Sequence, residues 1–301
     1  MKRQWLVLAA VVFSVSAEPV WAEIYLTNPS PARHDRFYTG ADGAFLAEGY
    51  DLSGVGRVDA TGSSSRWVTM ISDTYFLSAN HYAPANGSTV SFYLTNDPNG
   101  AVETRTVVSG SAIPGGDLYL GTLSAPVSSS VAKYPVLSLP SWTSYDGLEM
   151  FTLGLSVPEA SATDTSVRVG RNAIEQGGVG LQTVSGVPGV ASVFDYNNPS
   201  SLGGDESYLF AGDSGAPSFA IVDGSLALVG IHWFNRGNTA PGEGFPSGDT
   251  FVPAYVGLLN AAMSGEQITV VPEPSMLALL ACAGAGLALA GWRRRVNRPA
   301  S

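Results

Sequence analysis

Hydrophobic and polar positions alternate over short stretches in the middle of this chain. Val90, Phe92 and Leu94 are separated by polar residues, and the turn-forming stretch Asn96-Asp-Pro-Asn-Gly100 follows them. Residues 102–108 then alternate again. A period of two is typical of strands with one buried face, and Asn, Asp, Pro and Gly favour tight turns. Runs of the same character recur at 148–155, 166–170 and 225–231. The pattern predicts an all-β body of short strands.

A helical period follows these strands near the end of the body. Val256, Leu259 and Met263 fall on one face of a short helix over Pro253–Met263. Proline is well tolerated in the first helical turn, and the three apolar residues have the spacing of a buried stripe. We therefore expect one terminal helix beside the strands.

The first 22 residues have the pattern of an export signal. Lys2 and Arg3 precede a mostly apolar stretch over residues 5–15, and Val20-Trp-Ala22 offers a cleavage site before Glu23. A buried N-terminal helix is the alternative. The order of charge, apolar stretch and small residues favours a signal peptide over 1–22.

The other end of the chain carries a second targeting pattern. Val271-Pro-Glu-Pro-Ser275 leads into residues 276–292, which contain no charged residue, and Arg293, Arg294 and Arg295 follow. Such a run is long enough to cross a bilayer, with the arginines on the cytoplasmic side. We expect a transmembrane helix at 276–292, joined to the exported domain by a linker at 264–270.

Composition excludes several classes of function. The net charge of −10 argues against nucleic acid, because phosphate binding needs clustered Lys and Arg. The single cysteine, Cys282, lies in the apolar C-terminal run, so the exported domain has no disulfides. Three histidines and one cysteine do not give the usual zinc spacing, and no phosphate-binding glycine loop ends in Lys-Ser/Thr. We expect no metal and no cofactor.

Candidate chemistry is concentrated in three segments. Ser214 stands within Gly212-Asp-Ser-Gly215, where glycines allow a tight turn that exposes the hydroxyl. His81 ends an apolar, strand-like run from Trp67, and Asp117 opens the run to Leu123. A histidine can take the serine proton, and an aspartate can orient the imidazole. The amides of Gly212 and Ser214 are candidates for binding an oxyanion. Asp73 is a weaker candidate for the acid, because it lies inside the histidine's own strand segment.

These segments resemble the trypsin-like (chymotrypsin-fold) serine peptidases. The segment Phe76-Leu-Ser-Ala-Asn-His81 is similar to their histidine motif, Asp117-Leu-Tyr-Leu-Gly-Thr-Leu123 to their aspartate motif, and Gly212-Asp-Ser-Gly-Ala-Pro217 to their serine motif, in the same order. The resemblance implies an endopeptidase domain over 23–263 that acts through an acyl-enzyme. It also implies two packed six-stranded antiparallel barrels, at about 40–135 and 140–263, with the seam between Pro135 and Pro140.

Specificity is suggested by two further positions. Family spacing places Tyr208 where trypsins carry a carboxylate, which disfavours cleavage after Lys or Arg. The stretch Gly230-Ile-His-Trp233 resembles the glutamyl endopeptidases, in which the histidine receives an acidic P1 side chain. His232 and Trp233 are therefore candidate substrate-binding residues. A buried histidine in a barrel strand is the alternative reading of His232.

Activation is expected to differ from that of the trypsins. In that group the counterpart of Asp213 pairs with a new N-terminus, usually Ile-Val-Gly-Gly, and no such sequence precedes His81. Cleavage after Arg57 would leave too little chain for the first strands. We expect no such activation step, and the sequence does not name a partner for Asp213. His34, in a polar segment, is expected to be solvated.

The C-terminal pattern resembles a PEP-CTERM sorting signal, here over 271–301. This resemblance implies processing by an exosortase, retention in the inner membrane through 276–292 during sorting, and delivery to the cell surface or matrix. An exported serine endopeptidase with a protein or peptide substrate is the leading interpretation. A catalytically silent binding or matrix protein on the same fold is the alternative.

Overall fold

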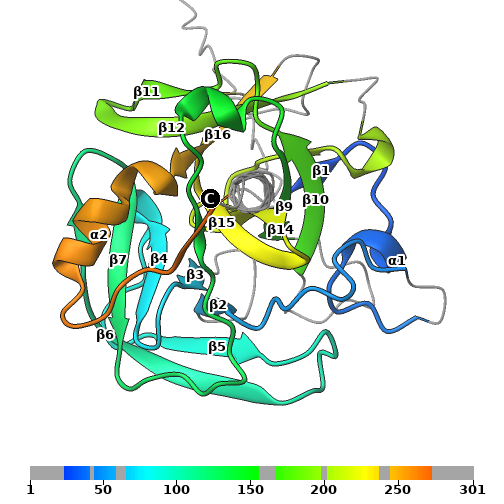
Figure 1. Cartoon of the computed structure of the whole chain (residues 1–301). Coiled ribbons are helices and arrows are strands. Elements are labelled where there is room, and N and C mark those ends of the chain that lie inside the picture. The colour runs from blue at the N-terminus through cyan, green and yellow to red at the C-terminus, as the bar shows by residue number, and fades with distance from the viewer. Residues whose placement is uncertain are drawn as a thin grey trace, which may run out of the picture.

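Six antiparallel strands of the N-terminal half close into a barrel. In the computed structural model this barrel occupies the lower part of Figure 1, in cyan and teal. Phe76, Phe92 and Val107 are among the fully buried side chains that fill it. The predicted strands at 90–94 and 102–108 form its β5 and β6, and the predicted first barrel is confirmed. In order around the barrel the strands are β2 (Val55–Val58), β3 (Arg66–Met70), β4 (Tyr75–Ala79), β7 (Leu118–Leu123), β6 (Val102–Ile113) and β5 (Thr89–Tyr93).

The C-terminal half is a nine-stranded sheet that does not close. The expectation of a second closed six-stranded barrel is therefore wrong. Two short strands lie off the main path, since β8 (Val136–Leu137) pairs in parallel with both β15 and β17 (Val270–Val271). The main path runs β10 (Val167–Ala173), β9 (Glu149–Leu155), β14 (Pro217–Val222), β15 (Ser225–Asn235), β16 (Phe245–Phe251), β12 (Val187–Tyr196) and β11 (Val179–Val184).

No backbone ladder joins β10 to β12 among the described strands, and the Asn172 side chain links them instead. The Asn172 amide donates hydrogen bonds to the carbonyls of Asp195, at 3.1 Å, and Ser207, at 2.8 Å. Ser207 begins the two-residue strand β13 (Ser207–Tyr208), which pairs with β1 (Tyr25–Leu26) instead of extending the main sheet. Outside its ladder with β9, β10 makes isolated backbone bridges to Asp35 and Glu206.

The two halves share one hydrophobic core. Its buried members come from the barrel, the sheet and the helix α2 (Val256–Ala262), which confirms the predicted terminal helix. The Tyr255 hydroxyl donates to the Gly115 carbonyl at 2.5 Å and accepts the Val190 amide at 2.8 Å. Examples of the shared core are Trp67, Leu77, Leu118, Leu153, Ile231 and Leu259.

The segment expected to be a linker, 264–270, contacts both halves. The Glu266 carboxylate accepts the Asp73 amide at 3.1 Å, in the turn between β3 and β4. Ile268 is buried, and Val270 begins strand β17. The chain therefore remains attached to the fold up to the point where the predicted tag begins.

His34 is buried, so the expectation that it is solvated is wrong. It ends the short helix α1 (Pro31–His34), and its Nε2 lies 3.1 Å from Oδ1 of Asp205. The two residues are 171 positions apart, so no local pattern indicates the pair.

The structure describes only part of the chain. The predicted signal peptide at 1–22 and the predicted transmembrane helix at 276–292 both lie outside that part. Among the described residues, no helix has the length and apolar character needed to span a bilayer. The described ranges are 24–40, 44–58, 66–155, 167–197, 202–236 and 245–272.

Candidate active site

The structure brings His81, Asp117 and Ser214 together at the junction of the two halves. His81 lies in the turn after β4, Asp117 directly precedes β7, and Ser214 lies in the loop between β13 and β14. His81 Nδ1 is 2.5 Å from Asp117 Oδ2, and His81 Nε2 is 2.9 Å from Ser214 Oγ. The weaker candidate, Asp73, instead lies at an exposed turn with Lys133 3.2 Å away.

Hydrogen bonds fix the imidazole in a useful orientation. The Asp117 carboxylate is buried and accepts the His81 backbone N–H at 2.8 Å as well as the ring nitrogen. An ionised carboxylate only accepts, so Nδ1 carries a hydrogen in this arrangement. Nε2 of the neutral ring is then the acceptor for the Ser214 hydroxyl. The arrangement can move a proton from Ser214 to His81.

The loop around Ser214 is a tight turn that requires glycine. Gly212 and Gly215 have φ of 101° and 90°, in the left-handed region that other residues rarely adopt. The Gly212 carbonyl points to Trp67, whose Nε1 lies 3.4 Å away. Within the described chain, neither the Gly212 nor the Ser214 N–H donates a hydrogen bond to another group. Both amides are therefore available to an oxygen placed beside Ser214.

The Asp213 side chain fixes this turn to the body of the protein. Its carboxylate is fully buried, and its two oxygens accept the backbone amides of Leu155 at 2.9 Å and Phe210 at 2.8 Å. Its backbone carbonyl accepts the Ala216 amide at 2.9 Å. The contact with Leu155 could not be read from the sequence, because Leu155 belongs to a distant strand. The anchor holds the Ser214 loop to strand β9.

Arg57 is inaccessible to a processing enzyme in the folded chain. It lies within β2 of the closed barrel and is buried beside the Trp67 ring. Burial lowers the pKa of Arg57 to about 10. A cleavage at this position would cut a barrel strand.

A small pocket of about 170 Å³ lies next to Ser214. Asn235 Nδ2 donates to the Leu209 carbonyl at 2.8 Å, which ties the two walls together. Of the predicted specificity residues, His232 and Trp233 line this pocket. Tyr208 does not, because it is fully buried and paired with Tyr25. The lining consists of Leu209, Phe210, Ala211, Asp213, Ser214, His232, Trp233, Phe234 and Asn235.

His232 has the environment of a buried histidine in a strand. It is 1% exposed, with Nδ1 2.6 Å from Asp249 Oδ1 and Nε2 2.8 Å from the Leu153 carbonyl. Burial, the largest single influence, would lower the pKa of His232, but the Asp249 and Asp213 carboxylates and the Leu153 carbonyl together raise it above the ordinary value. Both ring nitrogens are engaged within the protein. In this orientation His232 has no free donor for an acidic P1 side chain.

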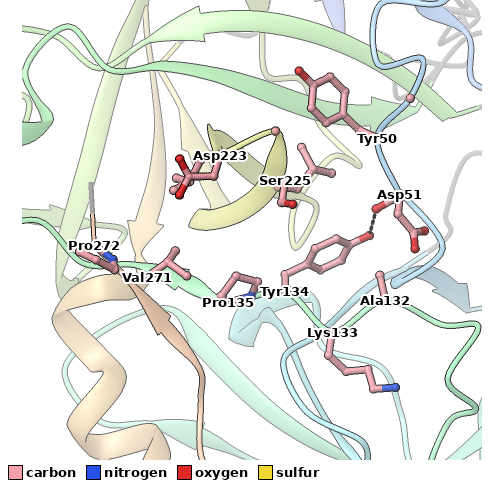
Figure 2. A pocket seen from close by; sticks show the side chains of 14 residues that line it. Tyr50, Asp51, Ala132, Lys133, Tyr134, Pro135, Asp223, Ser225, Val271 and Pro272 are labelled. Atoms are coloured by element: carbon pink, nitrogen blue, oxygen red, sulfur yellow. Dashed lines mark hydrogen bonds between the residues drawn. The ribbon is translucent and has the colours of Figure 1, made fainter. Parts of the chain in front are cut away.

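A larger pocket lies elsewhere and contains none of the three triad residues. It measures about 550 Å³ and is bounded by the 49–51 loop, the 132–135 connection, the β14–β15 turn and the C-terminal Val271–Pro272 (Figure 2). The Tyr134 hydroxyl crosses it to donate to the Asp51 carbonyl at 2.9 Å. Val271 and Pro272, the last described residues, form one edge of it.

Metal-binding side chains do not gather within the described residues. No group of three or more His, Cys, Asp or Glu side chains there is close enough to hold an ion. The absence of a metal or cofactor from the reaction stays a prediction.

In comparisons with known proteins, no family model matches the chain and no curated protein matches it. The likeness to trypsin-like peptidases therefore depends on the three sequence segments and on an all-β architecture with a closed six-stranded barrel, which is compatible with that fold.

Proposed function

We propose that this chain is an exported serine endopeptidase. The observation that carries the proposal is the continuous hydrogen-bonded row from Asp117 through His81 to Ser214, with 2.5 Å and 2.9 Å between the paired atoms. Its members come from both halves of the molecule and from three separate loops. A buried carboxylate, an imidazole and a hydroxyl in this order have the geometry of an activated nucleophile.

Acylation would begin with attack of Ser214 Oγ on the carbonyl carbon of a peptide bond. The hydroxyl proton passes to His81 Nε2, and Asp117 stabilises the imidazolium that forms. The carbonyl oxygen becomes negative and lies between the N–H groups of Gly212 and Ser214. Loss of one such donor typically raises the barrier by about 3 kcal/mol. The C–N bond then breaks, His81 returns its proton to the leaving amine, and an ester on Ser214 remains.

Deacylation would repeat these steps with water as the nucleophile. His81 Nε2 takes a proton from water, and the hydroxide attacks the ester carbon. The C–O bond to Ser214 breaks, and the serine oxygen recovers the proton from His81. Nearly half of the His81 side chain, 47%, is exposed, so water can reach the ring. The products are a free carboxylic acid and the restored enzyme.

Cleavage of a peptide library by the full-length chain tests this proposal. We expect Ser214→Ala to abolish cleavage, while Ser130→Ala, at an exposed loop serine, leaves it unchanged. Fragments identified by mass spectrometry give the P1 preference at the same time. Cleavage that survives Ser214→Ala would end the proposal.

A silent binding protein on the same fold remains the second candidate. It is favoured by the small size of the pocket beside Ser214, about 170 Å³. Binding of a peptide by both the wild type and Ser214→Ala, with no cleavage by either, would support it.

The sorting signal gives the proposed setting. We place the protein in the inner membrane through 276–292 until an exosortase-type enzyme processes the tag, and then at the cell surface or matrix. Replacement of Pro272, Glu273 and Pro274 by alanine should leave the protein in the membrane fraction. Unchanged release would contradict this placement.

A further inference from the structure

A buried polar cluster adjoins the Ser214 loop. It consists of His232 on β15, Asp249 on β16 and Asp213 in the loop itself, all of which are buried. Three groups face the His232 ring: the Asp249 carboxylate, the Leu153 carbonyl of β9, and the Asp213 carboxylate, which acts on it electrostatically. The mechanism proposed above uses neither His232 nor Asp249.

With Asp249 ionised, the hydrogen bonds of the cluster require two ring protons. A carbonyl oxygen accepts only, so Nε2 of His232 carries a hydrogen toward Leu153. The Asp249 carboxylate also accepts, at 2.6 Å, so Nδ1 carries the second hydrogen. The second oxygen of Asp249, Oδ2, is buried and has no hydrogen bond within the described chain. His232 is therefore an imidazolium held between acceptors.

His232 and Asp213 are joined through the same short piece of β9. His232 donates to the Leu153 carbonyl, and Asp213 accepts the Leu155 amide at 2.9 Å. Between them, a Cβ on Gly154 would lie 2.6 Å from Asp213 Oδ1, so only glycine allows this approach. The backbones are tied as well, because Gly215 N–H donates to the His232 carbonyl at 3.0 Å.

We propose that His232, supported by Asp249, is a positioning residue for the Ser214 loop. Its positive charge holds the Asp213 carboxylate in place, and Asp213 in turn holds the amides of Gly212 and Ser214 toward the oxyanion. This inference rests on the proposed function, since it assigns a role within that same site. The folded chain thus contains its own buried cation beside Asp213.

The sign of the pH effect follows from the direction of the pKa. The raised pKa of His232 keeps the ring charged past the ordinary histidine value of about 6.5. The contribution of His232 to stability is complete below that value and is lost as the pH rises through the pKa in the folded state. Activity should decline over the same alkaline range, while the rest of the fold persists.

The test measures how fast a fluorophosphonate probe labels Ser214 in the full-length protein across pH. We expect wild-type labelling to fall on the alkaline side, although circular dichroism shows a folded chain. His232→Gln should be labelled about 10²-fold more slowly at the wild-type optimum, a loss similar to that of one oxyanion donor, and should lack the alkaline decline.

Two further variants make the test specific. Asp249→Asn should shift the alkaline decline to lower pH, because the ring loses the carboxylate that favours its charge. His34→Gln is the matched control, since His34 is also a buried histidine beside an aspartate but lies on α1. It should keep the wild-type rate and profile.

The inference would be overturned if the wild type is labelled and His232→Gln has the same labelling rate and the same pH profile. A His232→Gln variant that changes only the P1 preference would overturn it too, because His232 would then contact substrate instead. If His232→Gln does not fold, two other results would overturn the inference. One is a wild-type labelling rate that does not decline at alkaline pH, and the other is an Asp249→Asn variant whose decline is not shifted. Failure of the wild type to label at all would contradict the proposed function itself.

Discussion

The two halves of this molecule hold their functional residues in different ways. The N-terminal half is a closed barrel, and His81 and Asp117 lie at the ends of its continuously paired strands. The C-terminal half is an open sheet, in which the Asn172 side chain links β10 to the Asp195 carbonyl of β12. The base and acid thus lie at the ends of a backbone ladder, whereas the loop of the nucleophile is held by the Asp213 carboxylate and by backbone hydrogen bonds. Because this second arrangement adjoins the buried His232, raised pH should disturb it more than the barrel.

The largest loss of activity should come from a change at Asp117, the barrel residue that orients His81. Asp117→Asn should lower kcat/KM by about 10⁴-fold, because an amide cannot accept both His81 hydrogens and favours the wrong tautomer. The folded state should persist by circular dichroism. Asp73→Asn, at the exposed turn, is the control and should keep full activity. Equal losses in the two variants would mean that Asp117 is not the acid.

Next in size is the loss of packing inside the closed barrel. Phe76 is fully buried in β4, so Phe76→Ala should lower the free energy of unfolding by about 3–5 kcal/mol. Urea titration measures the change. Val102→Ala, at a 42% exposed position on β6, should change it by less than about 0.5 kcal/mol. A small effect of Phe76→Ala would show that the barrel is not the rigid half.

The open edge of the sheet should show a smaller but more local effect. Asn172→Ala leaves the part-buried carbonyl of Asp195 and the buried carbonyl of Ser207 without this donor, which should lower the free energy of unfolding by about 2 kcal/mol. Hydrogen exchange should accelerate in β10 and β12 and stay unchanged in β4 and β7. Asn99→Ala, at an exposed turn, is the control. Faster exchange throughout both halves would contradict the comparison.

The smallest effect concerns the C-terminal segment that joins the halves. Burial alone would raise the pKa of Glu266, but hydrogen bonds from the turn around Thr74 lower it below its ordinary value. Its stabilising effect is present above about 4.5 and is lost as the pH falls through the pKa in the folded state. Glu266→Gln should lower the free energy of unfolding by less than about 1 kcal/mol at neutral pH. Urea titrations should show a difference in stability between the wild type and Glu266→Gln at neutral pH and no difference at strongly acidic pH.

Local pattern was sufficient to predict much of the fold. The alternation at 90–94 and 102–108 and the apolar run at 148–155 all form strands, and the 253–263 stripe forms the helix. Pattern did not predict the open sheet or the two-residue strand β13, which pairs with β1. Alternation indicates that a strand has one buried face, but it does not indicate whether two strands distant in the sequence pair at their edges.

The site was predicted to a similar extent. His81, Asp117 and Ser214 stand in recognisable segments, and the structure brings them together. The contacts of Asp213 with Leu155 and of His34 with Asp205 were not predictable, because these residues are far apart in the sequence. The Gly230-Ile-His-Trp233 stretch marked His232 without indicating that both its nitrogens would be engaged. Long-range polar contacts leave little trace in local sequence.

The central claim is that the two halves together activate Ser214, and covalent labelling tests it most directly. Full-length protein would be treated with a fluorophosphonate probe at neutral pH, and the modified residue identified by mass spectrometry. We expect the label on Ser214 in the wild type, a loss of labelling in His81→Ala, and no label in Ser214→Ala. A well-folded wild-type protein that takes no label at Ser214 would contradict the account.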